Sequence, residues 1–254
     1  MVSDILNVCE AADGIQDLAR RLKPDFKADQ QQDAAQFADF LFATLNVCVR
    51  IASGRNLPAG QIFYRALQRV QCECGYKSER FVADRTMKIA IDPNIMSASE
   101  GNVTLMQLIG NEFRNTPTPE DFVCKGFHLS NHATISRFLT TVPSYLFVHL
   151  KRFQHDDGEG RKVEEHVDFP IMALDILPVV HPSCRGQYST TYDCISIVEH
   201  LGDTLEFSHY ITKNRRYNSD DWISHDDTKI REVLAGSIVV SPHRLIPTSS
   251  LTKS

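Results

Sequence analysis

The fold is decided by residues 192–233, which read YDCISIVEHLGDTLEFSHYITKNRRYNSDDWISHDDTKIREV. Apolar and β-branched residues recur over 192–197 and again over 207–212, and such runs are typical of strands. Gly202 and Asp203 separate the two runs and predict a turn. We therefore expect a pair of strands here, followed by a polar loop.

One histidine of this stretch lies on a predicted strand. It is His209, and the carboxylates of Asp226 and Asp227 follow after the polar loop. A carboxylate can hold an imidazole in the orientation in which it accepts a proton from a thiol, and the thiolate that results is a strong nucleophile. The stretch thus predicts two of the parts that a cysteine nucleophile needs.

The composition is that of an ordinary globular protein. The chain has 254 residues, 42% of them apolar and 23% charged, which suits one large domain or two small ones. A net charge of −5 gives no reason to expect nucleic-acid binding. We expect neither a membrane span nor a signal peptide. The seven cysteines are odd in number and scattered, which favours reduced thiols and a cytoplasmic or nuclear location.

The rest of the chain predicts helices first and strands later. Apolar spacing predicts one helix over 3–23 that ends before Pro24, and a second that Asp29 can cap and that contains Phe37 and Phe40. We expect further elements at these positions: a strand and turn over 70–76, a strand over 80–92, a helix over 105–113, a buried central strand over 145–150 and a last strand over 237–240.

Residues 192–233 resemble the histidine box of the ubiquitin-specific proteases, papain-like cysteine enzymes that cut ubiquitin from its conjugates. His209 matches the catalytic histidine of that family, and Trp222 matches a tryptophan that precedes the orienting acid. Asp226 matches that acid, with Asp227 as a substitute one residue further on. Ser208 stands where the family has a glycine.

Three other segments match the family in the same order along the chain. The sequence Leu-Lys-Arg-Phe at 150–153 matches a central strand, which implies that His149 and Arg152 belong to the sheet and not to a catalytic site. Residues 162–175 match the segment that follows it.

The third segment resembles the family's glutamine-aspartate box. The resemblance implies that Gln32 and Asp33 bind the basic tail of ubiquitin. Ala35 and Gln36 replace a histidine and a glutamate of the family pattern. Because Gln36 removes a charge that could pair with an arginine, we expect weaker binding of the tail here.

A structural zinc site is a further implication of the resemblance. Cys72, Cys74, Cys124 and His128 can form a Cys₃His set, which zinc accepts. The family usually has two Cys-x-x-Cys pairs, whereas this chain has a Cys-x-Cys and a single later cysteine. The alternative is a finger that has lost its metal, with the thiols as small core residues. No other cofactor is expected.

The fold that the resemblance implies is α+β and papain-like. We expect a domain over 1–245 with a partial helical thumb, β-rich fingers at about 70–140 and a mixed or antiparallel palm sheet at about 141–240. Residues 246–254 have the composition of a disordered tail.

The family's cysteine box has no clear counterpart in this sequence. Cys9 has the Asn-x-Cys spacing, but it lacks the flanking glycines and is followed by Glu10, which opposes thiolate formation. Two interpretations therefore stand. The chain is a deubiquitinase domain, N-terminally truncated, that would hydrolyse the isopeptide bond after ubiquitin's C-terminal glycine, or it is a pseudo-deubiquitinase that binds ubiquitin or another protein. A third is a papain-like sheet unrelated to ubiquitin.

Overall fold

The computed structural model describes residues 34–53, 59–98, 103–118, 122–126, 132–156, 159–202, 209–217, 219–234, 238 and 248–253. Several predictions fall outside these residues: the helix over 3–23, the cap at Asp29 and nearly all of the strand over 237–240. The candidate residues Gln32, Asp33 and His128 also lie outside them.

The larger sheet is the palm. Its strands follow the order β15-β14-β13-β12-β16-β7-β3, and β11 pairs with β12 beside this path. The pairs are antiparallel except for β3 with β7, which is parallel, so the sheet is mixed as expected. The strands are β3 (Thr86–Ala90), β7 (Tyr145–Lys151), β11 (Leu174–Asp175), β12 (Thr191–Leu201), β13 (His209–Arg215), β14 (Trp222–Asp226), β15 (Lys229–Val233) and β16 (Thr248–Lys253).

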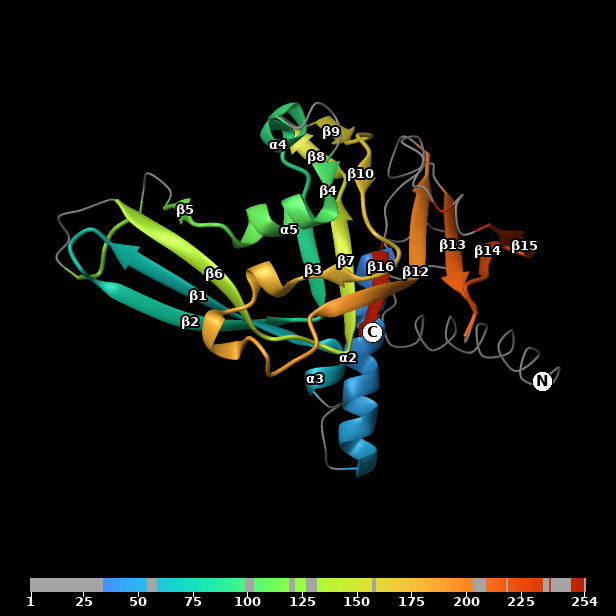
Figure 1. Ribbon diagram of the computed structural model, residues 1–254, viewed down its shortest axis with the longest axis horizontal. Coiled ribbons are helices and arrows are strands. Elements are labelled where there is room, and N and C mark those ends of the chain that lie inside the picture. The colour runs from blue at the N-terminus through green and yellow to red at the C-terminus, as the bar shows by residue number, and fades with distance from the viewer. Residues whose placement is uncertain are drawn as a thin grey trace.

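A second sheet forms the fingers, which project to the left of the palm in Figure 1. It has the order β2-β1-β6-β5 and contains β1 (Tyr64–Cys72), β2 (Lys77–Asp84), β5 (Thr116–Pro117) and β6 (Ala133–Thr141). The single strand predicted over 80–92 is therefore wrong: β2 belongs to the fingers and β3 to the palm. Asp84 makes the break, because its carboxylate accepts the backbone N–H of Arg85 at 2.7 Å.

The described helices are α2 (Ala34–Ser53), α3 (Ala59–Ile62), α4 (Pro93–Ala98) and α5 (Leu105–Phe113), with 3₁₀ turns η1 (Leu177–Val179) and η2 (Pro182–Cys184). Three of them, α2, α3 and α5, contact strands of the palm sheet. The predicted helices in α2 and α5 are confirmed. Helix α2 reaches the sheet through an edge-to-face contact of Phe42 with Phe147, whose ring centroids are 4.9 Å apart. None of the described helices has the length and apolarity to cross a membrane.

Short strands complete the fold above the palm. β4 (Val103–Thr104) pairs in parallel with β10 (Val167–Asp168), and β8 (Phe153–Asp156) pairs with β9 (Glu159–Lys162) as a hairpin. Thr104 also caps α5: its hydroxyl accepts the backbone N–H of Gln107 at 3.2 Å, and the Gln107 side chain accepts the Thr104 N–H at 2.7 Å. This capping box fixes the start of the helix.

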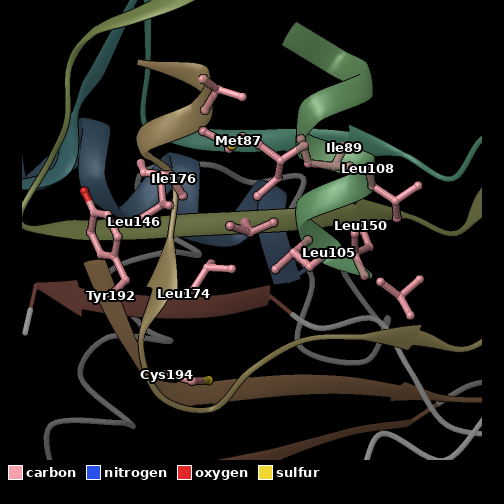
Figure 2. Packing of buried hydrophobic residues seen from close by; sticks show 14 of the residues in the cluster. Met87, Ile89, Leu105, Leu108, Leu146, Leu150, Leu174, Ile176, Tyr192 and Cys194 are labelled. Carbon is pink, nitrogen blue, oxygen red and sulfur yellow. The ribbon is translucent and has the colours of Figure 1, made fainter. Parts of the chain in front are cut away.

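The main core lies between the palm sheet and α5 (Figure 2). Leu146, Val148 and Leu150 of β7 are almost fully buried, which confirms a central strand. Figure 2 shows Leu105 and Leu108 of α5 facing residues of β3 and β7. Tyr192 is also fully buried, and its hydroxyl donates to the carbonyl of Pro143 at 2.6 Å.

The end of the chain differs from the expectation. Residues 246–254 were predicted to be a disordered tail, but Thr248–Lys253 form β16 between β12 and β7. The prediction rested on polar composition. Backbone groups of two neighbouring strands pair with β16 on both sides, and that pairing needs no apolar side chain.

Candidate active site

Two neighbouring strands bring the predicted pair together. β13 begins at His209, which lies opposite Leu201 of β12. β14 ends at Asp226, and the register of Thr212 with His225 places that end beside the start of β13. The polar loop between these strands returns the chain so that residues 17 positions apart meet.

The imidazole and the carboxylate are in hydrogen-bond contact. Nε2 of His209 lies 2.6 Å from Oδ1 of Asp226, and the two side chains are 40% and 37% exposed. The hydrogen bond from His209 holds the pKa of Asp226 below its usual range, and the nearby charges of Lys229 and Arg231 act in the same direction. Asp226 is therefore ionised at neutral pH, so Nε2 carries the proton and Nδ1 is left for a nucleophile.

Asp227 takes a different position from Asp226. It lies in the turn between β14 and β15 with φ at 51° and is exposed. Ligand atoms of His209, Asp226 and Asp227 lie within 4.8 Å of one another, but Lys229 and Arg231 oppose a cation there. The geometry therefore favours an acid–base pair over a metal site, with Asp226 in contact with the imidazole.

No thiol joins this group among the described cysteines. Cys72, Cys74 and Cys124 lie in the fingers, and Cys184 lies on η2. Cys194 is buried in the palm, where its thiol donates to the carbonyl of Ser196 at 3.7 Å. Burial raises the pKa of Cys194 to about 12, which keeps the thiol protonated. The described part of the site thus holds an imidazole and a carboxylate in contact.

The fingers bring three of the four predicted zinc ligands together. The sulfurs of Cys72, Cys74 and Cys124 lie within 4.8 Å of one another, and those of Cys74 and Cys124 are 3.4 Å apart. Cys72 and Cys124 are almost fully buried. Gly75, with φ at 87°, makes the turn that returns the chain after Cys74. Three sulfurs at this spacing suit a soft metal ion such as zinc.

Three charged residues of the strands around the site were not predicted to have a role. Glu199 of β12 and Lys213 of β13 form an ion pair of 2.6 Å inside the sheet. Lys162 of β9 donates to the carbonyls of His200 and Gly202. The charge of Glu199 within the mostly apolar β12 was a signal for the ion pair. Lys162 begins the segment 162–175 that matches the family, but its partners are backbone atoms, which the sequence does not indicate.

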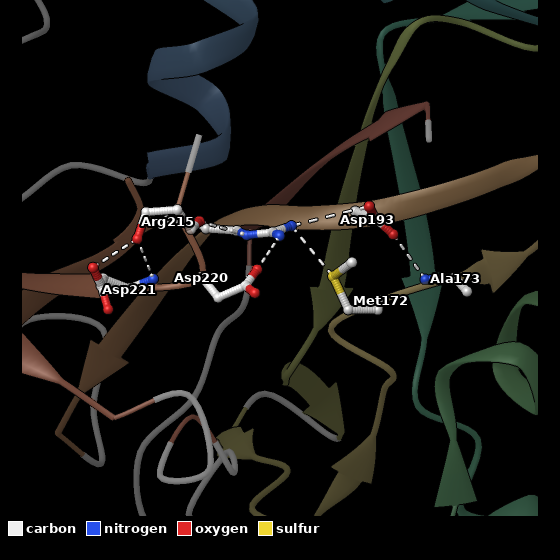
Figure 3. Close-up of polar contacts among 7 residues, drawn as sticks. Met172, Ala173, Asp193, Arg215, Asp220 and Asp221 are labelled. Carbon is white, nitrogen blue, oxygen red and sulfur yellow. Dashed lines mark hydrogen bonds and ion pairs between the residues drawn. The ribbon is translucent and has the colours of Figure 1, made fainter. Parts of the chain in front are cut away.

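A cavity of about 600 Å³ lies at the opposite end of β13 and is lined by Tyr145, Ile195, Arg215, Arg216, Tyr217, Ser219 and Asp220. Figure 3 shows that its central arginine is engaged: Arg215 contacts Asp220 at 2.5 Å, Asp193 at 4.0 Å and the sulfur of Met172 at 3.2 Å. Because acids already neutralise Arg215, this end of the sheet is a structural network and not an anion site.

The palm sheet, the fingers and the contact of His209 with Asp226 are the arrangement expected from the sequence for a papain-like cysteine hydrolase. The family model "Ubiquitin carboxyl-terminal hydrolase" matches residues 9–247. The chain therefore belongs to the ubiquitin carboxyl-terminal hydrolase family, with the ubiquitin-specific protease catalytic domain that the sequence motifs predict.

Relatives and solved structures agree with this assignment. The chain is similar to "Ubiquitin carboxyl-terminal hydrolase 20" of Arabidopsis thaliana, with 24% identity over 214 residues. The matched region covers 83% of this chain but only 29% of the length of that relative. Its fold is similar to a SAGA DUB module of Ubp8, Sgf11, Sus1 and Sgf73 bound to monoubiquitin (TM-score 0.76, 17% identity, 93% of this chain and 51% of that chain). A second such module, bound to ubiquitin aldehyde, has a TM-score of 0.75 at 16% identity and covers 93% and 52%. The predicted α+β fold is confirmed.

Proposed function

We propose that this chain is a ubiquitin-binding deubiquitinase domain whose His209 and Asp226 serve hydrolysis of the isopeptide bond after ubiquitin's C-terminal glycine. The observation that carries the proposal is the 2.6 Å contact of His209 with Asp226 inside a fold of this family. The ubiquitin bound to the similar DUB modules supports the choice of partner.

The geometry assigns a proton path to the pair. With Nε2 bonded to Asp226, Nδ1 of His209 takes the proton of a cysteine thiol, and the thiolate attacks the glycine carbonyl carbon. The tetrahedral intermediate collapses to a thioester as Nδ1 returns that proton to the departing lysine amine. Water then gives a proton to Nδ1 and attacks the thioester, which releases the ubiquitin carboxylate and restores the thiol.

The alternative is a pseudo-deubiquitinase that binds ubiquitin and cuts nothing. It is favoured by the absence of a thiol beside His209 among the described residues, where the group contains only His209, Asp226 and Asp227. The replacements Ala35 and Gln36 in the segment proposed to bind the ubiquitin tail with Gln32 and Asp33 favour it as well. A deubiquitinase requires ubiquitin binding, whereas a pseudo-deubiquitinase binds ubiquitin or another protein, so ubiquitin binding is the first property to test.

The test measures binding and cleavage on the same preparation. Calorimetry should detect ubiquitin binding by the chain of this sequence, and a Asp33→Ala variant should bind less tightly. Because no described thiol lies beside His209, the same protein is not expected to release fluorophore from ubiquitin aminomethylcoumarin, and the hydrolysis assigned to His209 and Asp226 requires a cysteine from outside the described residues. No ubiquitin binding would refute the proposal. Cleavage that His209→Ala abolishes would refute the pseudo-deubiquitinase alternative, and its loss in Cys9→Ser but not Cys184→Ser would identify the nucleophile.

We also propose that the finger thiols bind one structural zinc ion. Three thiolates from Cys72, Cys74 and Cys124 would hold the metal, with His128 as the proposed fourth ligand. Such a site would join the turn after β1 to the segment before β6, and reduced thiols of this kind suit the cytoplasm or nucleus. Metal analysis should give about one zinc per chain. Cys72→Ser should lower it, whereas Cys184→Ser on η2 should not; a parent protein without zinc would refute the site.

A further inference from the structure

The β8–β9 hairpin touches the strand that lies opposite His209. Lys162, the last residue of β9, donates from its ammonium group to the carbonyls of His200 at 3.4 Å and of Gly202. His200 lies at the end of β12 and Gly202 directly follows that strand, and Leu201 between them pairs with His209. One side chain of the hairpin thus holds the backbone on both sides of the residue that pairs with the candidate base.

A second contact joins the same elements through rings. Phe153 lies opposite Lys162 in the hairpin, and its ring packs edge-to-face on His200 with centroids 5.4 Å apart. His200 in turn packs on Tyr210, which follows His209, at 4.9 Å. His200 is 1% exposed. The hairpin therefore contacts β12 directly and β13 through His200, at the end of these strands where His209 lies.

The base of the hairpin is itself fixed. The backbone N–H of Val163 donates to the carbonyl of Arg152 at 2.6 Å, and the guanidinium of Arg152 donates to the carbonyls of Val163 and Glu165 at 3.0 and 2.8 Å. Arg152 is 2% exposed. Lys162 is therefore held by a buried anchor, and a side chain on such a support can hold a neighbouring backbone in place.

His209 depends on this backbone because its own side chain is 40% exposed and its hydrogen bond is to Asp226. A ring with so little packing takes its position from the strand that carries it. A charged donor on two carbonyls is among the stronger hydrogen-bonding arrangements in a protein. The carbonyls of His200 and Gly202 are the points at which this end of β12 is held.

We propose that Lys162 is a positioning residue for His209: it ties the β8–β9 hairpin to the end of β12 and so keeps the imidazole aligned with Asp226. The catalytic meaning of that alignment rests on the proposed function, but the alignment itself can be measured without activity. Lys162 needs to be an ammonium or guanidinium, because an apolar side chain cannot donate to the two carbonyls.

The experiment is long-range ¹H–¹⁵N spectroscopy of the His209 ring in the full chain. The parent should show one tautomer with the proton on Nε2. In Lys162→Met, the second tautomer should rise about tenfold or more, because the variant loses the charged hydrogen bonds to the carbonyls of His200 and Gly202. Lys162→Arg should restore the parent spectrum, and Lys151→Met, at an exposed lysine of the palm sheet, should leave it unchanged.

The outcomes separate this proposal from the proposed function. Unchanged ring signals in a folded Lys162→Met protein would overturn the positioning role, as would an altered spectrum that Lys162→Arg fails to restore. Lys162→Leu also lacks a donor, and it carries the same test if the methionine variant does not fold. Ubiquitin binding measured on the same samples tests the proposed function independently. A parent protein that does not bind ubiquitin would still show whether Lys162 sets the tautomer of the His209 ring.

Discussion

Replacing Lys213 with methionine should destabilise the palm sheet by about 3–5 kcal/mol, the usual cost of leaving one partner of a buried ion pair without the other. Its Nζ lies 2.6 Å from Oε1 of Glu199, and the side chains are 15% and 2% exposed. Methionine keeps the stem of lysine but not its charge. The Glu199 carboxylate would then stay in the sheet without its cation, and water can reach little of it.

The assay is urea denaturation at neutral pH, followed by fluorescence of Trp222 and checked by thermal melting. A loss of 3–5 kcal/mol corresponds to a fall in melting temperature of about 6–20 °C for a domain of this size. Lys151→Met is the control, since this lysine is exposed on the same sheet. The double variant Lys213→Met with Glu199→Leu should recover most of the loss, because it removes the buried charge as well.

Two results would refute this reasoning. A loss below about 1 kcal/mol in Lys213→Met would mean that the pair behaves like a solvent-exposed ion pair despite its burial. A double variant as unstable as Lys213→Met would mean that the stranded Glu199 carboxylate is not the cause.

Three further predictions concern the core, a helix cap and a buried thiol. Leu146→Ala should cost about 2–5 kcal/mol in urea denaturation because Leu146 is fully buried in the central strand; a smaller loss would show that the site collapses around the alanine. Thr104→Ala should cost about 1 kcal/mol by removing the cap of α5, and Thr104→Ser should restore it; equal stability of all three proteins would contradict the role of the capping box. Burial raises the pKa of Cys194 from 9.0 to about 12, so the folded state keeps a proton that the unfolded chain releases. The stability that this gives is complete below pH 9.0 and is lost as the pH rises through about 12. Cys194→Val should reduce the fall of the urea midpoint above pH 9.0, and an unchanged fall would contradict the assignment.

The local pattern was sufficient for one of the two strands that carry the candidate site. The β-prone runs over 192–197 and 207–212 predicted two strands, and the structure has β12 and β13 there, whereas β14, which carries Asp226, was not predicted. Sequence alone could also suggest His209 and Asp226, since a strand, a loop and a strand can bring their ends together. The distance of 2.6 Å required the register of the two strands, which no local pattern contains.

The sheet that each strand joins could not be predicted in the same way. The alternation over 80–92 continues through Arg85, and only the tertiary structure decides that β2 joins β1 while β3 joins β7. Strand β16 was missed for a related reason: its backbone pairs with β12 and β7 on its two sides, although its composition is polar. In both cases the deciding interactions are between residues far apart in sequence.

The buried pair of Glu199 and Lys213 gives the sheet a means to hold the register that the site needs. Glu199 lies opposite Ile211, and Lys213 lies two residues further along β13, so both charges are on one face. A slip of one residue between β12 and β13 would move them to opposite faces and would turn Ile211, 7% exposed, out of the core. Because an unpaired buried charge costs about 3–5 kcal/mol, the slipped register is strongly disfavoured. The correct register is the one in which Leu201 lies opposite His209. The ion pair of Glu199 and Lys213 therefore helps to keep His209 in its position, although it lies outside the site.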